Sequence, residues 1–100
     1  MTIRMICYDI SDDKLRTKIA KKLFVWGCER WQYSVFCGAH SPTQWQKCWA
    51  SIQQLLAKYG QGDEKIMAVI ISAQELKNMT TVGEKPDIAE LLGEKITFWF

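Results

Sequence analysis

Three carboxylates stand where an apolar segment runs into a helical pattern, in the stretch YDISDD over residues 8–13. Asp9 is the candidate for chemistry, since Mg²⁺ prefers oxygen ligands and commonly takes one or two carboxylates while it keeps several waters. Asp12 and Asp13 are better explained as the start of a helix, where acidic side chains cap free N–H groups and interact favourably with the helix dipole. A strand-end aspartate also commonly buttresses the turn that follows it. The residue pattern by itself favours this second interpretation of Asp9.

A cationic group follows the carboxylates. Lys14, Lys18 and Lys22 recur at a spacing of four, which aligns them on one side of a helix. Residues 1–50 carry eight Lys or Arg and four Asp or Glu, whereas residues 51–100 carry five and seven. A basic surface on one side of a molecule can bind the phosphates of a nucleic acid, or it can simply be hydrated. Nucleic-acid binding and a solvated helix face therefore both remain open.

Five side chains are candidates for contact with a nucleic-acid backbone. Arg16 and Arg30 are preferred, because a planar guanidinium matches a phosphate and because each lies close to a motif. Lys14 and Lys18 follow from the helix spacing. The Ser34 hydroxyl is a further candidate, although polar residues in strands more often bond local backbone or face solvent.

The remaining polar and aromatic residues receive structural interpretations. Tyr8 and Tyr33 are expected to pack in the sheet, with stacking or donation to phosphate as the alternative. His40 is the single histidine and has no evident nucleophile or carboxylate partner, so we do not expect a general base. The four cysteines lack the short paired spacings of zinc or redox sites, which favours free thiols.

Two amphipathic helices are predicted from apolar residues at three-to-four spacing. The first begins at Ser11 or Asp12 and stops at Gly27. The second opens with a capping box that starts at Ser41, and the helix ends at Gly60. It carries a broad apolar face that begins at Trp45 and includes Tyr59.

Strand composition recurs between and after these helices. Residues 2–9 are apolar on nearly both faces, which predicts a central strand, and the continuous apolar run within residues 65–72 predicts a buried one. Residues 29–37 form either one bent strand or two short strands. Further short strands are expected at 80–83 and 96–100.

This order of elements indicates an α+β fold, a ferredoxin-like sandwich βαββαβ with an added C-terminal strand. We expect one domain over residues 1–100, with a C-terminal extension from about 80 to 100. Two helices would cover one face of an antiparallel sheet, and a second copy is the simplest cover for the other, which predicts a homodimer. No apolar run approaches the roughly 20 residues of a membrane span and the polar start does not resemble a signal peptide, so a cytoplasmic protein without membrane contact is expected.

Two motifs in a fixed order carry a family resemblance. YDISDDK at residues 8–14 is followed by QYSVF at 32–36 and by Gly38. In motif order, spacing and chain length, the sequence resembles the small CRISPR-associated endonuclease family, the non-integrase subunit of spacer acquisition. The likeness extends through the second helix and the strand at 66–72, so it covers nearly the whole chain.

The resemblance implies a ferredoxin-like homodimer in which Asp9 of each copy reaches a shared cleft. There the pair would hold Mg²⁺, or another divalent cation such as Mn²⁺, for phosphodiester hydrolysis, which makes Asp9 both a candidate metal ligand and a candidate catalytic residue. It also implies that the strand at 96–100 crosses to the partner or docks the integrase. Family members often carry an acidic residue where this chain has Cys37, and that departure weakens the nuclease expectation.

The expected function is therefore CRISPR spacer acquisition in antiviral defence. The dimer would bridge integrase subunits and bind the backbone of a double-stranded DNA protospacer, with endonuclease activity toward RNA or double-stranded DNA. Two alternatives stay open: a purely structural DNA-binding scaffold without catalysis, and a toxin-like ribonuclease of the same fold.

Overall fold

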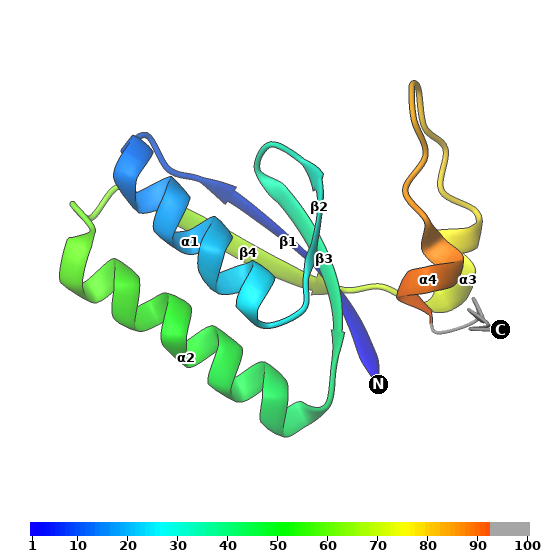
Figure 1. Cartoon of the computed structure of the whole chain (residues 1–100), viewed down its shortest axis with the longest axis horizontal. Coiled ribbons are helices and arrows are strands. Elements are labelled where there is room, and N and C mark those ends of the chain that lie inside the picture. The colour runs from blue at the N-terminus through cyan, green and yellow to red at the C-terminus, as the bar shows by residue number, and fades with distance from the viewer. Residues whose placement is uncertain (93–100) are drawn as a thin grey trace, which may run out of the picture.

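The computed structural model describes residues 1–92, and its elements follow the predicted order through the fourth strand. The elements are β1 (Thr2–Asp9), α1 (Asp13–Val25), β2 (Glu29–Gln32), β3 (Val35–His40), α2 (Pro42–Tyr59), β4 (Lys65–Ile70), α3 (Ala73–Lys77) and α4 (Ile88–Leu91). Figure 1 shows α1 and α2 side by side on one side of the sheet, with α3 and α4 together where the chain leaves β4.

The sheet has the order β2-β3-β1-β4, and all of its neighbours are antiparallel. β1 pairs with β3 on one side and β4 on the other, which confirms the predicted central strand. The segment 29–37 is two short strands rather than one bent strand, with an irregularity in the pairing between Arg30 and Gln32. This is the ferredoxin-like α+β arrangement that the sequence predicts.

Both long helices begin and end where their capping residues predict. The Asp12 carboxylate accepts a hydrogen bond of 2.8 Å from the backbone N–H of Leu15, so Asp12 rather than Ser11 caps α1. Gly27 follows the helix with a φ of 76°, a left-handed conformation that glycine adopts at little cost. Ser41 and Gln44 form the expected reciprocal capping box at the start of α2.

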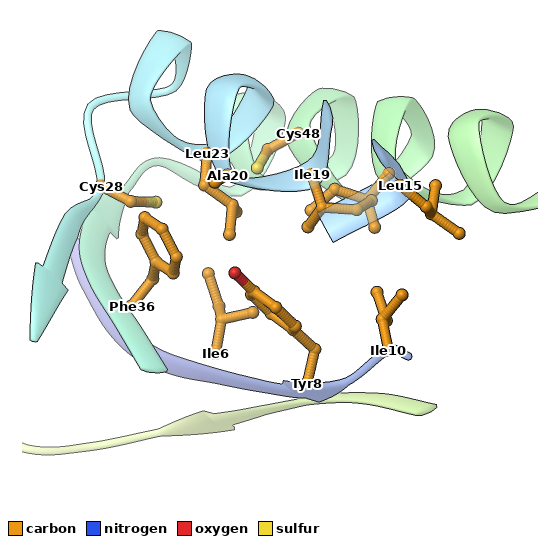
Figure 2. Close-up of a cluster of buried hydrophobic side chains, with 11 residues drawn as sticks. Ile6, Tyr8, Ile10, Leu15, Ile19, Ala20, Leu23, Cys28, Phe36 and Cys48 are labelled. Carbon is orange, nitrogen blue, oxygen red and sulfur yellow. The ribbon is translucent and has the colours of Figure 1, made fainter. Parts of the chain in front are cut away.

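The main hydrophobic core lies between the sheet and the two long helices (Figure 2). Its buried members are Ile6, Tyr8, Ile10, Leu15, Ile19, Ala20, Leu23, Cys28, Phe36, Cys48 and Ile52. A second, smaller cluster joins the opposite face of the sheet to α3 and α4 and consists of Ile3, Cys37, Leu76 and Ile88. The opposite face is therefore covered at the Ile3 end of β1, where this cluster lies.

The prediction of a buried strand at 65–72 is wrong for the chain alone. Among the strands within residues 1–92, β4 lies at the edge of the sheet and pairs with β1 alone, and Met67 and Val69 are 65% and 52% exposed. Ile66 and Ala68 alternate with them and pack against the main core. An apolar run on both faces of a strand does not reveal whether the second face is covered by the same chain.

Two smaller predictions also differ from the structure. Residues 80–83 form no strand; they follow α3 as an exposed loop in which Val82 is fully exposed and Gly83 has a φ of 89°. Tyr59, assigned to the apolar face of α2, is 42% exposed at its end. The predicted strand at 96–100 lies outside the described residues. Among helices within residues 1–92, none is long and apolar enough to cross a membrane.

Candidate functional site

Asp9 lies at the end of β1 on the face of the sheet that α1 and α2 do not cover. Tyr8 and Ile10 on either side of it are buried in the main core, and side chains alternate along a strand. Asp9 is exposed, its register partner on β4 is Lys65, and two residues back Cys7 opposes Met67. Together with Tyr8 these four residues line a shallow depression of about 310 Å³.

The ligand set that one chain offers at this place is small. Within residues 1–92, no group of three or more His, Cys, Asp or Glu side chains lies close enough to hold a metal ion. The exposed Asp9 carboxylate is the type of oxygen ligand that Mg²⁺ accepts, and Mg²⁺ is content with one or two carboxylates. The residues present therefore fit a divalent cation if a second Asp9 completes the pair.

Arg16 holds the turn that follows Asp9. Its Nη1 donates hydrogen bonds of 2.7 Å to the carbonyl of Ile10 and 2.9 Å to that of Ser11, and its Nη2 forms an ion pair with Asp13. The guanidinium fork, chosen from the sequence as a phosphate contact, is thus largely occupied within the chain.

Arg30 lies beside Arg16, and the two guanidinium groups flank the same tyrosine. The Cζ atoms of Arg16 and Arg30 are 5.7 Å and 5.8 Å from the centre of the Tyr33 ring. Ser34 follows Tyr33 in the turn between β2 and β3, where its backbone carbonyl accepts a hydrogen bond of 3.1 Å from Tyr8 N–H. The structure therefore places three of the five residues predicted to contact a nucleic-acid backbone at one end of the sheet, namely Arg16, Arg30 and Ser34.

Lys14 and Lys18 do not join this group. Both are exposed on α1, and the Lys18 ammonium lies 4.7 Å from the ring of Tyr59 on α2. The expected alignment of Lys18 and Lys22 is found on this side, where both border a groove between α1 and the end of α2. The cationic side chains of α1 therefore lie on two sides of the helix: Arg16 lies near Tyr33, whereas Lys18 and Lys22 border the groove beside α2.

Near Arg30, the sequence does not single out Phe24 and misplaces Tyr33. Phe24 is 51% exposed, and together with Lys21 it borders a second depression, which Arg16, Arg30 and Tyr33 also line. The expectation that Tyr33 packs in the sheet is wrong, because it occupies a turn and is 67% exposed, whereas Tyr8 is buried as predicted. Phe24 follows the buried Leu23 and lies off the apolar stripe of α1, a signal that the sequence already contained.

His40 and the cysteines have structural roles. His40 is 3% exposed and its Nε2 lies 2.7 Å from the Trp26 carbonyl oxygen; because a carbonyl only accepts, Nε2 carries the proton and donates. The cysteines are free thiols, and burial raises the pKa of Cys28 and Cys37 to about 12 and that of Cys48 to about 11. Such thiols are poor nucleophiles and poor metal ligands near neutral pH.

Comparison with known proteins assigns the chain to a family. The sequence model of the family described as CRISPR associated protein Cas2 matches residues 1–79. The chain belongs to this Cas2 family. The "CRISPR-associated endoribonuclease Cas2" of Aeropyrum pernix is 30% identical over 83% of this chain and 87% of its own length. The "CRISPR-associated endoribonuclease Cas2 1" of Archaeoglobus fulgidus is 29% identical over 93% of this chain and 94% of its own.

A solved structure has the same fold. A chain of the "Partial Cas6-RT-Cas1--Cas2 complex" superposes with a TM-score of 0.72 at 23% identity, covering 82% of this chain and 91% of that chain. The ferredoxin-like arrangement and the Cas2 family resemblance inferred from YDISDDK and QYSVF are confirmed by these comparisons.

Proposed function

We propose that the protein is a homodimeric subunit of a CRISPR spacer-acquisition complex, which bridges integrase subunits and contacts the DNA backbone. The observation that carries this proposal is the uncovered sheet face, where exposed apolar side chains adjoin Asp9. Family membership supports the pathway, and the solved chain of similar fold belongs to a complex whose name includes both Cas1 and Cas2. We infer that this complex is cytoplasmic.

The uncovered face supports a second copy of the chain as its partner. Met67 and Val69 are more than half exposed beside Cys7, and fully burying a large apolar side chain contributes about 1.5–3 kcal/mol. A two-fold contact places the same patch on both copies. Asp9 lies at the rim of that patch, so a two-fold axis that passes close to the Asp9 end of β1 would bring the two Asp9 carboxylates together.

We further propose that the two Asp9 carboxylates hold Mg²⁺, or Mn²⁺, and support phosphodiester hydrolysis of RNA or double-stranded DNA. A bound divalent cation would polarise a phosphate oxygen and lower the pKa of a bound water. The names of the curated relatives contain the word endoribonuclease, which supports the nuclease class. The chain's own contribution is a carboxylate placed at the end of a central strand, with Arg16 fixing the turn behind it.

The exposed cations of α1 support contact with a DNA backbone. Lys14 and Lys18 are exposed, and Lys22 borders the same groove as Lys18. In the described part of the chain, none of these three lysines forms an ion pair with a carboxylate, so their charges are not neutralised within the protein. Lysines that neutralise phosphates release counterions, and affinity should accordingly fall steeply with salt.

A scaffold role without catalysis is the second candidate, favoured by the position of Lys65. This lysine is the register partner of Asp9, so a cation bound to that carboxylate would lie close to a second positive charge. The bridging role does not depend on Asp9 being a metal ligand. The two functions are therefore separable by changing Asp9 alone.

The test compares wild type with Asp9→Asn, a change of charge at nearly constant shape on an exposed residue. We expect both proteins to dimerise, to co-purify with the CRISPR integrase and to support spacer acquisition, while Mg²⁺-dependent cleavage is lost in the variant. Failure of the wild type to form an integrase complex would contradict the bridging proposal. Loss of acquisition in an intact Asp9→Asn complex would contradict a role that is independent of catalysis, and equal cleavage by both proteins would contradict the role of Asp9.

A further inference from the structure

Two side chains that bind metals by different chemistry share the depression at the end of β1. Cys7 and Asp9 both line it, together with Lys65 and Met67 from β4. We infer that Cys7 and Asp9 of two copies together bind a thiophilic divalent cation such as Zn²⁺. The inference rests on the dimer and the Asp9 pair proposed above, and it adds a second ligand that decides which metal the site prefers.

The spacing of Cys7 and Asp9 suits a shared ion. Tyr8, which separates them in sequence, is buried in the main core, so both neighbours belong to the face that α1 and α2 do not cover. Alternate residues of a strand are about 6.6 Å apart, because each residue adds about 3.3 Å. A Zn²⁺ ion between them needs a bond of about 2.3 Å to sulfur and one of about 2.0–2.2 Å to oxygen, which the two side chains can reach from either side. One chain therefore offers a thiol and a carboxylate to the same point.

The thiol of Cys7 is available to an ion, in contrast to the others. Cys7 is partly exposed, whereas Cys28, Cys37 and Cys48 are buried. Within residues 1–92, neither the Cys7 thiol nor the Asp9 carboxylate is engaged in a side-chain hydrogen bond or an ion pair. Spacing rules for zinc sites count the cysteines of one chain, so they do not detect a site that a second copy completes.

A two-fold contact supplies the full ligand set. Because the symmetry repeats each side chain, an axis that passes close to Cys7 and Asp9 brings two thiols and two carboxylates around one point. Four ligands in a tetrahedron are the usual coordination of Zn²⁺, and each thiol releases its proton to solvent as its bond to the metal forms. Mg²⁺ takes six oxygen ligands in an octahedron, and thiolate sulfur is a poor ligand for it. The thiols therefore shift the preference of the site from Mg²⁺ to Zn²⁺.

Lys65 favours the larger ligand set. It is the register partner of Asp9 and lines the same depression. If two carboxylates alone held a divalent cation, they would neutralise it, and the charges of the two Lys65 ammonium groups would remain beside it. Two thiolates bring two further negative charges, so the four anionic ligands balance the ion together with both ammonium groups. The lysine that disfavours Mg²⁺ at Asp9 therefore favours an ion that thiolates also bind.

The experiment uses Co²⁺ as a visible substitute for Zn²⁺, because bonds between Co²⁺ and thiolates give a charge-transfer band in the near ultraviolet. Reduced wild-type protein is titrated with Co²⁺ while this band is recorded, and Zn²⁺ is then added. We expect the band to saturate at one ion per two chains. Zn²⁺ should then abolish it, since tetrahedral thiolate ligands suit Zn²⁺.

Cys7→Ser removes the sulfur and keeps the size of the side chain. It should abolish the band and raise the Kd for Zn²⁺ at least about 100-fold, since even the loss of a residue behind a ligand costs about 10- to 100-fold. Binding of Mn²⁺, followed by electron paramagnetic resonance, should persist in this variant because carboxylates suit that ion. Cys48→Ala is the matched control: it removes a thiol that is buried in the main core and should leave the band unchanged.

The outcomes separate this inference from the proposed function. Absence of the band in wild type, or its persistence in Cys7→Ser, would overturn the role of Cys7 and leave Mn²⁺ binding by the Asp9 pair standing. A band that saturates at one ion per chain would overturn the shared site. If wild type bound neither Co²⁺ nor Mn²⁺, both this inference and the proposed metal site at Asp9 would be wrong.

Discussion

The Arg16 guanidinium donates a hydrogen bond of 2.7 Å to the carbonyl of Ile10, the residue directly after Asp9. A second bond reaches the Ser11 carbonyl, and the ion pair with Asp13 completes a bracket from α1 to the end of β1. Arg16, which the sequence predicts as a phosphate contact, therefore fixes the backbone next to the candidate metal ligand Asp9. Arg16 is in this respect a positioning residue.

Arg16→Gln should lower the free energy of unfolding by about 1–3 kcal/mol, because it removes charge-assisted hydrogen bonds to two backbone carbonyls of the turn. Urea denaturation followed by circular dichroism measures this change. Lys18→Gln is the control and should stay within about 0.5 kcal/mol, since Lys18 is exposed on the same helix. Equal stability of the two variants, with weaker nucleic-acid binding by Arg16→Gln, would return Arg16 to the role of a phosphate contact.

Met67→Glu should weaken the proposed dimer at least about tenfold while leaving the monomer folded. The side chain is 65% exposed on the uncovered face, so a carboxylate there is tolerated by one chain and is costly when a second chain buries it. Sedimentation velocity over a range of concentrations measures the dissociation constant. Val25→Glu replaces a similarly exposed apolar residue on α1 and should leave the dimer intact; a Met67→Glu dimer as strong as wild type would mean that another surface joins the copies.

The buried thiols predict a loss of stability at alkaline pH. Burial raises the pKa of Cys28 to about 12 from an ordinary value of 9.0, so the unfolded chain releases this proton first. The stabilising contribution is complete below about pH 9 and is lost as the pH rises toward 12, with a slope of up to about 1.4 kcal/mol per pH unit for each such thiol. Cys28→Val should show a shallower decline in unfolding free energies between pH 9 and 11; an unchanged slope would show that other groups dominate.

The helix boundaries could be predicted from the sequence because they depend on local backbone chemistry. The side chains of Asp12 and Ser41 accept hydrogen bonds from backbone N–H groups at the helix starts, and Gly27 adopts a left-handed conformation just after α1. Each of these residues acts on backbone within a few positions and is found where expected. The central position of β1 follows from its apolar character on both faces. These features require no knowledge of distant parts of the chain.

The remaining errors come from contacts that a local pattern does not contain. The apolar run of β4 indicates burial but not by what, and in one chain Met67 stays exposed. Tyr33 has strand composition but occupies a turn, so its ring faces solvent between two arginines. The same difference applies to the candidate site. Asp9 can be selected from its motif, whereas the hydrogen bonds of Arg16 to the carbonyls of Ile10 and Ser11 become evident only from the folded structure.

In the proposed dimer, two copies meet through the uncovered sheet face and share one divalent cation between their Asp9 residues. Titration of the protein with Mn²⁺, with the free ion followed by electron paramagnetic resonance, measures how many ions two chains bind. We expect one bound Mn²⁺ per two chains in wild type and the loss of this binding in both Asp9→Asn and Met67→Glu. One ion per chain, or binding that persists in Asp9→Asn, would show that a pair of Asp9 residues does not hold the ion.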